Sequence, residues 1–207
     1  MMKSSLPATL LAFLTVWACQ AEEKSFASYV MEGYEQEAAD NYGQAVEAYS
    51  QALALTEDSP VALVRRAYCH VQLKNFEAAA EDLKLASVAT PVTMTDYQTL
   101  AWLKATSSFV VIRDAVIAVT YAQKAHTEDP TAASYDILAA AYAEMGSFQK
   151  AANLLKAGLK KFPDSDRAPG MKSRLALYAE RKPFRDAWLE DDTKELKEFE
   201  RTIRRAQ

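Results

Sequence analysis

The sequence is poor in the residues that most often carry chemistry. Its 207 residues include five glycines, two histidines and two cysteines. The glycines are too far apart to form a phosphate-binding loop, and no Gly-x-Ser-x-Gly nucleophile elbow occurs. His70 and His126 belong to no cluster with metal-ligand spacing. We therefore predict no cofactor, no metal site and no small-molecule substrate, and we expect that the protein is not an enzyme.

An excess of basic charge is also missing. The chain has 24 Lys and Arg against 28 Asp and Glu, which gives a net charge of -4 and a pI near 5.3. Binding of nucleic acid requires Lys and Arg clustered on one face, so nucleic acid is excluded as a partner. Half of the residues are hydrophobic, and together with the length this is enough to bury the core of one ordinary domain.

Residues 1–18 have the features of an export signal. Lys3 supplies a positive charge, and the apolar run from Leu6 to Ala18 is shorter than the roughly 20 residues needed to span a bilayer. The stretch Val16-Trp17-Ala18-Cys19 resembles the bacterial lipobox, in which the cysteine becomes the acylated first residue. This resemblance implies that Cys19 is the lipidation site and that residues 19–25 form a linker after the anchor.

An alternative to lipidation is ordinary secretion. Trp17 departs from the lipobox, which usually has a small or β-branched residue there, and cleavage after Ala18 or Ala21 would also suit a signal peptide. The mature chain is expected outside the cytoplasm, either on the periplasmic face of a bacterial envelope as a lipoprotein or as a soluble periplasmic or secreted protein. Acylation of Cys19 would leave Cys69 without a disulfide partner, so we expect Cys69 to be a buried core residue.

Four segments after the signal share one spacing of small residues. Each has a small residue, a second position four residues later and another small residue three further on, which places all three on one helical face. A segment of similar length precedes each one and predicts a companion helix. The triplets are Ala45/Tyr49/Ala52, Ala79/Leu83/Ala86, Ala118/Ala122/Ala125 and Ala151/Leu155/Gly158.

These helix pairs resemble the tetratricopeptide repeat, a helix–turn–helix unit of about 34 residues. Its clearest copy matches at Tyr135, Leu138, Ala139, Tyr142, Gly146, Phe148, Ala151 and Pro163. Small residues let neighbouring backbones approach, while a glycine allows the turn and a proline stops the second helix. The resemblance implies an all-α fold, a right-handed α-solenoid of about four units (26–59, 60–93, 94–131 and 132–165) plus C-terminal capping helices (166–207).

Two parts of the chain depart from the repeat. The spacing in the third unit is about five residues too long, so residues 107–114 are predicted to form an enlarged turn or a lengthened helix. Residues 174–186 resemble tails that follow the last repeat in other bacterial tetratricopeptide-repeat proteins, and a final helix is predicted with one stripe of Leu196, Phe199 and Ile203. We favour a cap over a partner-recruiting helix, because the end of a solenoid needs a polar-backed cap.

The resemblance also implies protein binding, in the concave groove lined by the first helix of each pair. An alternative for its two central aromatic residues, Tyr68 and Trp102, is packing between adjacent repeats. Arg65 is the single cation among the groove positions, so we do not expect the subtype that docks chaperones through paired cationic and amide groups. The groove positions carried over are Tyr34, Arg65, Tyr68, Gln72, Gln98, Trp102, Asp136 and Glu144.

The function predicted from these features is a non-catalytic interaction scaffold of the bacterial cell envelope. Its partners are expected to be envelope proteins, and its attachment to the membrane is expected through the lipid anchor. The alternative is a structural subunit that associates with itself within an envelope complex.

Overall fold

The computed structural model describes residues 24–110, 112–188, 197, 201–202 and 204–205. Over these residues the fold is all-α without strands, so the predicted fold class is confirmed. The predicted signal peptide, Cys19 and the stripe of the predicted last helix lie outside the described residues. The described helices are α2 (Phe26–Ala38), α3 (Tyr42–Leu55), α4 (Pro60–Gln72), α5 (Phe76–Val88), α6 (Met94–Thr106), α7 (Ala115–Glu128), α8 (Ala132–Glu144), α9 (Phe148–Lys161) and α10 (Ala168–Ala179).

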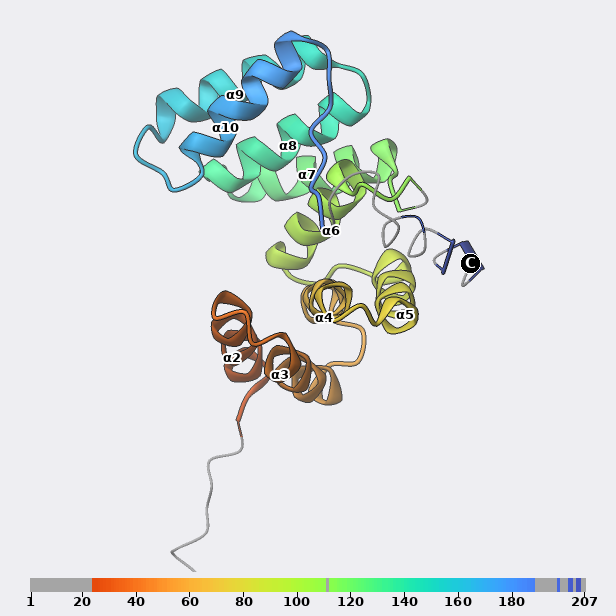
Figure 1. Cartoon of the computed structure of the whole chain (residues 1–207). Helices are drawn as coiled ribbons and strands as arrows, with labels where there is room; N and C mark the ends of the chain where they lie inside the picture. Colours follow the sequence, from red (N-terminus) through yellow and green to blue (C-terminus); the bar gives the residue numbers. More distant parts are fainter. Residues whose placement is uncertain (1–23, 111, 189–196, 198–200, 203, 206–207) are drawn as a thin grey trace, which may run out of the picture.

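Consecutive helices form hairpins that stack in chain order. α2 packs on α3, α4 on α5, α6 on α7 and α8 on α9, while α10 packs against α9 at the end of the stack. Figure 1 shows this progression from α2 and α3 at one end of the molecule to α8, α9 and α10 at the other. The segment after α10 then runs back across α8 and α7 towards α6.

The turns inside the hairpins follow one geometry in three of the four units. After α8, Gly146 has φ +79°, and the Ser147 N–H donates to the Tyr142 carbonyl at 2.8 Å. This pattern is a Schellman motif, which ends a helix at a residue in the left-handed region. Asp40 (φ 57°) and Lys74 (φ 61°) take the same place after α2 and α4. The predicted turn at Gly146 is therefore present, and the same turn forms where no glycine is available.

The third unit has the enlarged turn. α6 ends at Thr106 and α7 begins at Ala115, so the extra residues lengthen the connection and not a helix. Phe109 and Ile112 of this turn are buried and pack with the helices of the first two units. Asp114 then caps α7 by accepting from the N–H groups of the first helical turn.

The hydrophobic core falls into two large clusters. The first contains residues of α2 to α5 together with Leu103 and the two buried residues of the enlarged turn. The second extends from α6 to α10. Close backbone approach between α5 and α6 is sparse, whereas α3 packs on α4 and α7 on α8. The joint between the second and third units is therefore the place where direct helix packing is weakest.

Cys69 lies in the interior, as predicted. It has no exposed surface and packs beside Ala45 and Tyr49 of α3. Burial raises the pKa of its thiol to about 12, so the thiol stays protonated at neutral pH. Its contribution is that of a small core side chain.

Replacement of Gly158 by alanine is expected to destabilise the solenoid. A Cβ at this position would lie 2.6 Å from Met171 Cε and 2.9 Å from Tyr135 Cβ. Overpacking typically costs about 1–3 kcal/mol, and the helical preference for alanine returns only about 0.5–1 kcal/mol. We expect a net loss of about 1–2 kcal/mol in the free energy of unfolding, measured by urea denaturation.

Gly43→Ala is the matched control, because a Cβ at Gly43 would meet nothing within 4 Å. Its expected effect is neutral or a gain of up to about 1 kcal/mol. Equal effects of the two substitutions would contradict the close-packing explanation.

Candidate functional site

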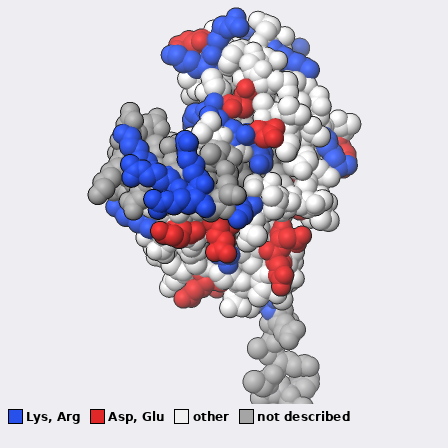
Figure 2. Space-filling model, turned by 90° about the vertical axis from the view of Figure 1, so that its right-hand side faces the viewer, with Lys and Arg blue, Asp and Glu red and all other residues white. Residues whose placement is uncertain are grey.

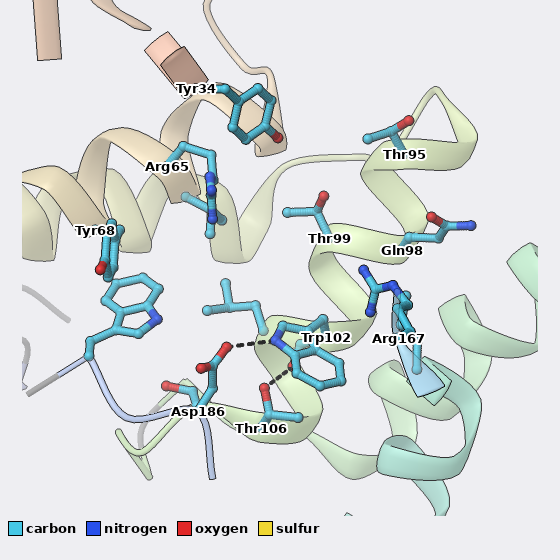
Figure 3. Close-up of a pocket in the computed structure, with 15 residues that line it drawn as sticks. Tyr34, Arg65, Tyr68, Thr95, Gln98, Thr99, Trp102, Thr106, Arg167 and Asp186 are labelled. Atoms are coloured by element: carbon cyan, nitrogen blue, oxygen red, sulfur yellow. Dashed lines mark hydrogen bonds between the residues drawn. The ribbon is translucent and has the colours of Figure 1, made fainter. Parts of the chain in front are cut away.

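A hollow on the inner face of the stack brings together five of the eight predicted groove residues. Its volume is about 390 Å³, and it lies between α2, α4 and α6, with the start of α10 on the opposite side. Figure 3 shows Arg65, Gln98 and Trp102 around this space, with Tyr34 at its rim. The residues that line it are Tyr34, Val64, Arg65, Tyr68, Thr95, Gln98, Thr99, Trp102, Leu103, Thr106, Ser107, Ile137, Arg167, Asp186 and Trp188.

Arg65 has partners of its own. Its Nη2 atom lies 2.7 Å from Glu37 Oε1, and its guanidinium stacks over the Tyr34 ring at 4.8 Å. Burial raises the pKa of Glu37, an effect that the positive charge of Arg65 opposes. The Nε atom of Arg65 is buried without a hydrogen-bond partner, so one donor of the side chain is still unused. Because this Nε atom is buried, a ligand would reach Arg65 through the rest of its side chain, which is 37% exposed.

Arg167 is a second cation at the hollow, which the sequence prediction of a single cation missed. It precedes α10 and lies opposite Arg65 in Figure 3. Its Nη1 atom lies 3.4 Å from Asp136 Oδ2, and its side chain is 42% exposed. Arg167 is therefore partly available at the rim of the hollow.

Trp102 is engaged by a distant part of its own chain. Its indole N–H donates to Asp186 Oδ2 at 2.7 Å, and its ring packs against Phe184 at a centroid distance of 5.7 Å. The Arg174 guanidinium lies 5.3 Å from the Trp102 ring and 5.0 Å from the Phe184 ring. Trp102 thus joins α6 to the segment that follows α10.

Tyr68 and Gln72 of α4, which belongs to the repeat before that of Trp102, contact the same segment after α10. The Tyr68 ring lies edge-on to Trp188 at 5.8 Å, and the Gln72 amide donates to the Trp188 carbonyl at 3.1 Å. We refer to residues 183–188 as the strap. The open alternative for Tyr68 and Trp102 was packing between repeats. Tyr68 does contact Tyr42 of the preceding unit, at a centroid distance of 6.2 Å, and Trp102 packs against the second cluster, while both residues also contact the strap.

Asp136 requires a correction, because it cannot contact a partner in this structure. Its side chain is fully buried and accepts from Arg174 Nε at 2.8 Å and Nη2 at 2.6 Å. Burial raises the pKa of this carboxyl, and the charges of Arg174 and Arg167 oppose that shift. The physical reason for the error is that α10 covers this part of α8, so a groove position became an internal ion pair.

Glu144 also serves the fold. It lies 3.0 Å from Arg113 Nε of the enlarged turn and 2.7 Å from Arg185 Nη1 of the strap. Both ion pairs are partly buried, with 14% of the Glu144 side chain exposed. The carboxylate of Glu144 is therefore occupied by two arginines and is not a free contact for a partner.

Within the described ranges, no three His, Cys, Asp or Glu side chains are grouped as a metal site would require. No helix in those ranges combines the length and apolar character needed to cross a membrane. Figure 2 shows that basic and acidic side chains both occur on the face it presents.

Comparison with known proteins identifies the repeat. A family model described as Tetratricopeptide repeat matches residues 37–103. No curated protein matches the chain. Among solved structures, one titled "Crystal structure of MamA protein" shares 19% sequence identity, with a TM-score of 0.44, and the match covers 75% of this chain and 88% of that chain.

The stacked helix hairpins define a helical-repeat protein, an α-solenoid. With the family match, residues 37–103 are tetratricopeptide repeats, and the predicted repeat type is confirmed. Repeats of this kind are modules of protein–protein interaction scaffolds.

Asp136→Asn is expected to destabilise the protein strongly, because it leaves Arg174 buried without its anionic partner. Breaking a buried ion pair from one side typically costs about 3–5 kcal/mol. The measurement is the free energy of unfolding from urea denaturation at pH 7. Glu180→Gln is the control, since Glu180 pairs with Lys182 on the exposed surface and its loss should leave the midpoint unchanged. A midpoint for Asp136→Asn equal to that of the control would contradict a supporting role for this pair.

Proposed function

We propose that this protein is a non-catalytic interaction scaffold of the bacterial cell envelope that binds a segment of a partner protein in its concave groove. The observation that carries the proposal is the hollow between α2, α4 and α6, where aromatic, amide and guanidinium groups converge. Aromatic and arginine side chains supply most of the energy at protein interfaces, so this lining suits a protein ligand.

The open part of the hollow offers polar groups that the fold does not use. Thr95 is exposed, Gln98 and Thr99 are half-buried, and 37% of the Arg65 side chain is exposed. Peptide backbones present both donors and acceptors, and amide, hydroxyl and guanidinium groups can satisfy them. An interface of this limited size supports transient binding, with a Kd on the order of micromolar.

Photocrosslinking from Gln98 in living cells tests this proposal. Gln98 lines the hollow, so a photoreactive residue there probes it without removing the strap contacts made by Trp102 and Tyr68. We expect capture of one envelope protein, identified by mass spectrometry. Capture at Gln98 should weaken when Arg65 is replaced by alanine.

Gln51, an exposed residue of the outer helix α3, provides the matched control position. The same protein captured equally from Gln51 and Gln98 would contradict binding in the groove. Capture of a second copy of this chain would instead support the self-associating structural subunit. Capture of nothing at Gln98 would overturn the proposed site.

Attachment to the envelope is proposed through Cys19. A single acyl chain gives marginal membrane binding, whereas several chains hold a lipoprotein firmly. Cys19→Ala is therefore expected to move the protein from the membrane fraction to the soluble fraction after a high-salt wash. Cys69→Ala is the control and should leave the distribution unchanged, because the Cys69 thiol is buried.

Retention of Cys19→Ala in the washed membrane fraction would rule out lipid anchoring at this residue. The intact mass of the mature wild-type chain then distinguishes ordinary cleavage after Ala18 from cleavage after Ala21.

A further inference from the structure

The strap lies on the groove as an extended peptide. Phe184, Asp186 and Trp188 are partly buried against the helices, and Ala187 is exposed; Arg185 is also partly buried and reaches Glu144 at 2.7 Å. Residues at i, i+2 and i+4 of an extended chain point to the same side. The sequence Phe-Arg-Asp-Ala-Trp therefore directs an aromatic, an acidic and a second aromatic side chain onto one surface.

The main chain of the strap pairs with the end of α6. The Asp186 N–H donates to the Thr106 carbonyl at 2.8 Å, and Asp186 forms an isolated parallel bridge with Ser107. The Ser108 hydroxyl donates to the Asp186 carbonyl at 3.3 Å. These bonds use only backbone atoms of the strap, so another extended segment can form them in the same way.

The side chains of the strap add chemical selection. Asp186 accepts from the Trp102 indole, while Phe184 packs on the ring of the same tryptophan. Trp188 packs between Tyr68 at 5.8 Å and Phe109 at 6.0 Å. The groove thus provides aromatic surface for Phe184 and for Trp188, and the indole N–H of Trp102 lies between these two places.

We propose that the partner presents an extended segment with the pattern aromatic, basic, acidic, any residue, aromatic, in which the basic residue pairs with Glu144 as Arg185 does, and that this segment binds by replacing the strap. The inference rests on the proposed function, since it specifies the partner of the same groove. The strap shows which chemistry the surface accepts, and its connection to α10 lets it leave the groove without unfolding a helix.

A tethered strap competes with any partner. An intramolecular ligand acts at an effective concentration on the order of millimolar. The apparent affinity for a partner is reduced by the fraction of molecules in which the groove is open. Weakening the strap should therefore strengthen binding of a peptide supplied from outside, although no groove residue has changed.

The test uses a labelled peptide with the sequence of residues 182–188, Lys-Pro-Phe-Arg-Asp-Ala-Trp, and the full-length mature chain. Asp186→Ala and Trp188→Ala each weaken the strap and leave the helix residues that line the groove unchanged. We expect fluorescence anisotropy to show that each variant binds the peptide at least about tenfold more tightly than the wild type does. Adding Trp102→Phe to the Asp186→Ala variant should reverse this gain, because it removes the indole donor.

Two controls accompany the measurement. A peptide with Phe184 and Arg185 exchanged and Ala187 and Trp188 exchanged has the same composition, but its aromatic residues no longer share the face of the acidic residue, and it should not bind. Lys182→Ala, an exposed position outside the strap, should behave as the wild type does. Thermal melts test whether each variant is folded. If Asp186→Ala does not fold, the measurement is made with Trp188→Ala.

Absence of peptide binding to both strap variants would overturn the proposal, as would equal binding to wild type and variants. Strap exchange between copies, detected as a dimer by light scattering, would also overturn it. The proposed function can survive these failures, because specific capture from Gln98 does not depend on the aromatic–acidic–aromatic pattern.

Discussion

Close approach of helix backbones at small residues is the constraint on which the rest of this structure depends. Ala45 and Ala52 have no exposed surface, and a Cβ on Gly33 would collide with the Tyr49 ring. A hairpin of two such helices cannot bury its apolar faces alone, so each unit relies on its neighbours. This dependence is interrupted between the second and third units, where α5 and α6 pack sparsely.

The strap and the enlarged turn compensate for that interruption. Phe109 of the turn joins the first hydrophobic cluster, and Trp188 packs against it. Phe184 packs against the second cluster, which extends from α6 to α10. Six consecutive residues therefore touch both halves of the solenoid, with Asp186 bonded to α6 between the two aromatic side chains. Direct helix packing is replaced at this joint by a segment that returns from the far end of the chain.

The features that could be predicted from the sequence are those set by the spacing of residues within one repeat. Helix pairs, the turn at Gly146 and the buried Cys69 follow from residues within one repeat, where sequence distance and spatial distance agree. Which of the groove residues stay accessible depends on contacts with residues far away in the sequence. Asp136 pairs with Arg174, 38 residues away, and Trp102 pairs with Asp186, 84 residues away. Repeat periodicity carries no information about such contacts. The alternation in Phe-Arg-Asp-Ala-Trp was a signal of an extended segment with one buried face, although it does not indicate which surface that face meets.

Occupancy of the groove and cohesion of the solenoid are coupled through the strap. A segment that replaced only Phe184 and Asp186 would leave Tyr68 and Phe109 without the ring of Trp188, and the first cluster would lose a covering side chain. A segment with both aromatic residues restores contact with both halves. Under the proposed replacement of the strap, the joint favours ligands that span it over ligands that fill one side, because only the former restore aromatic contacts on both halves. Specificity then comes from the weakness of the α5–α6 packing as well as from the chemistry of Trp102.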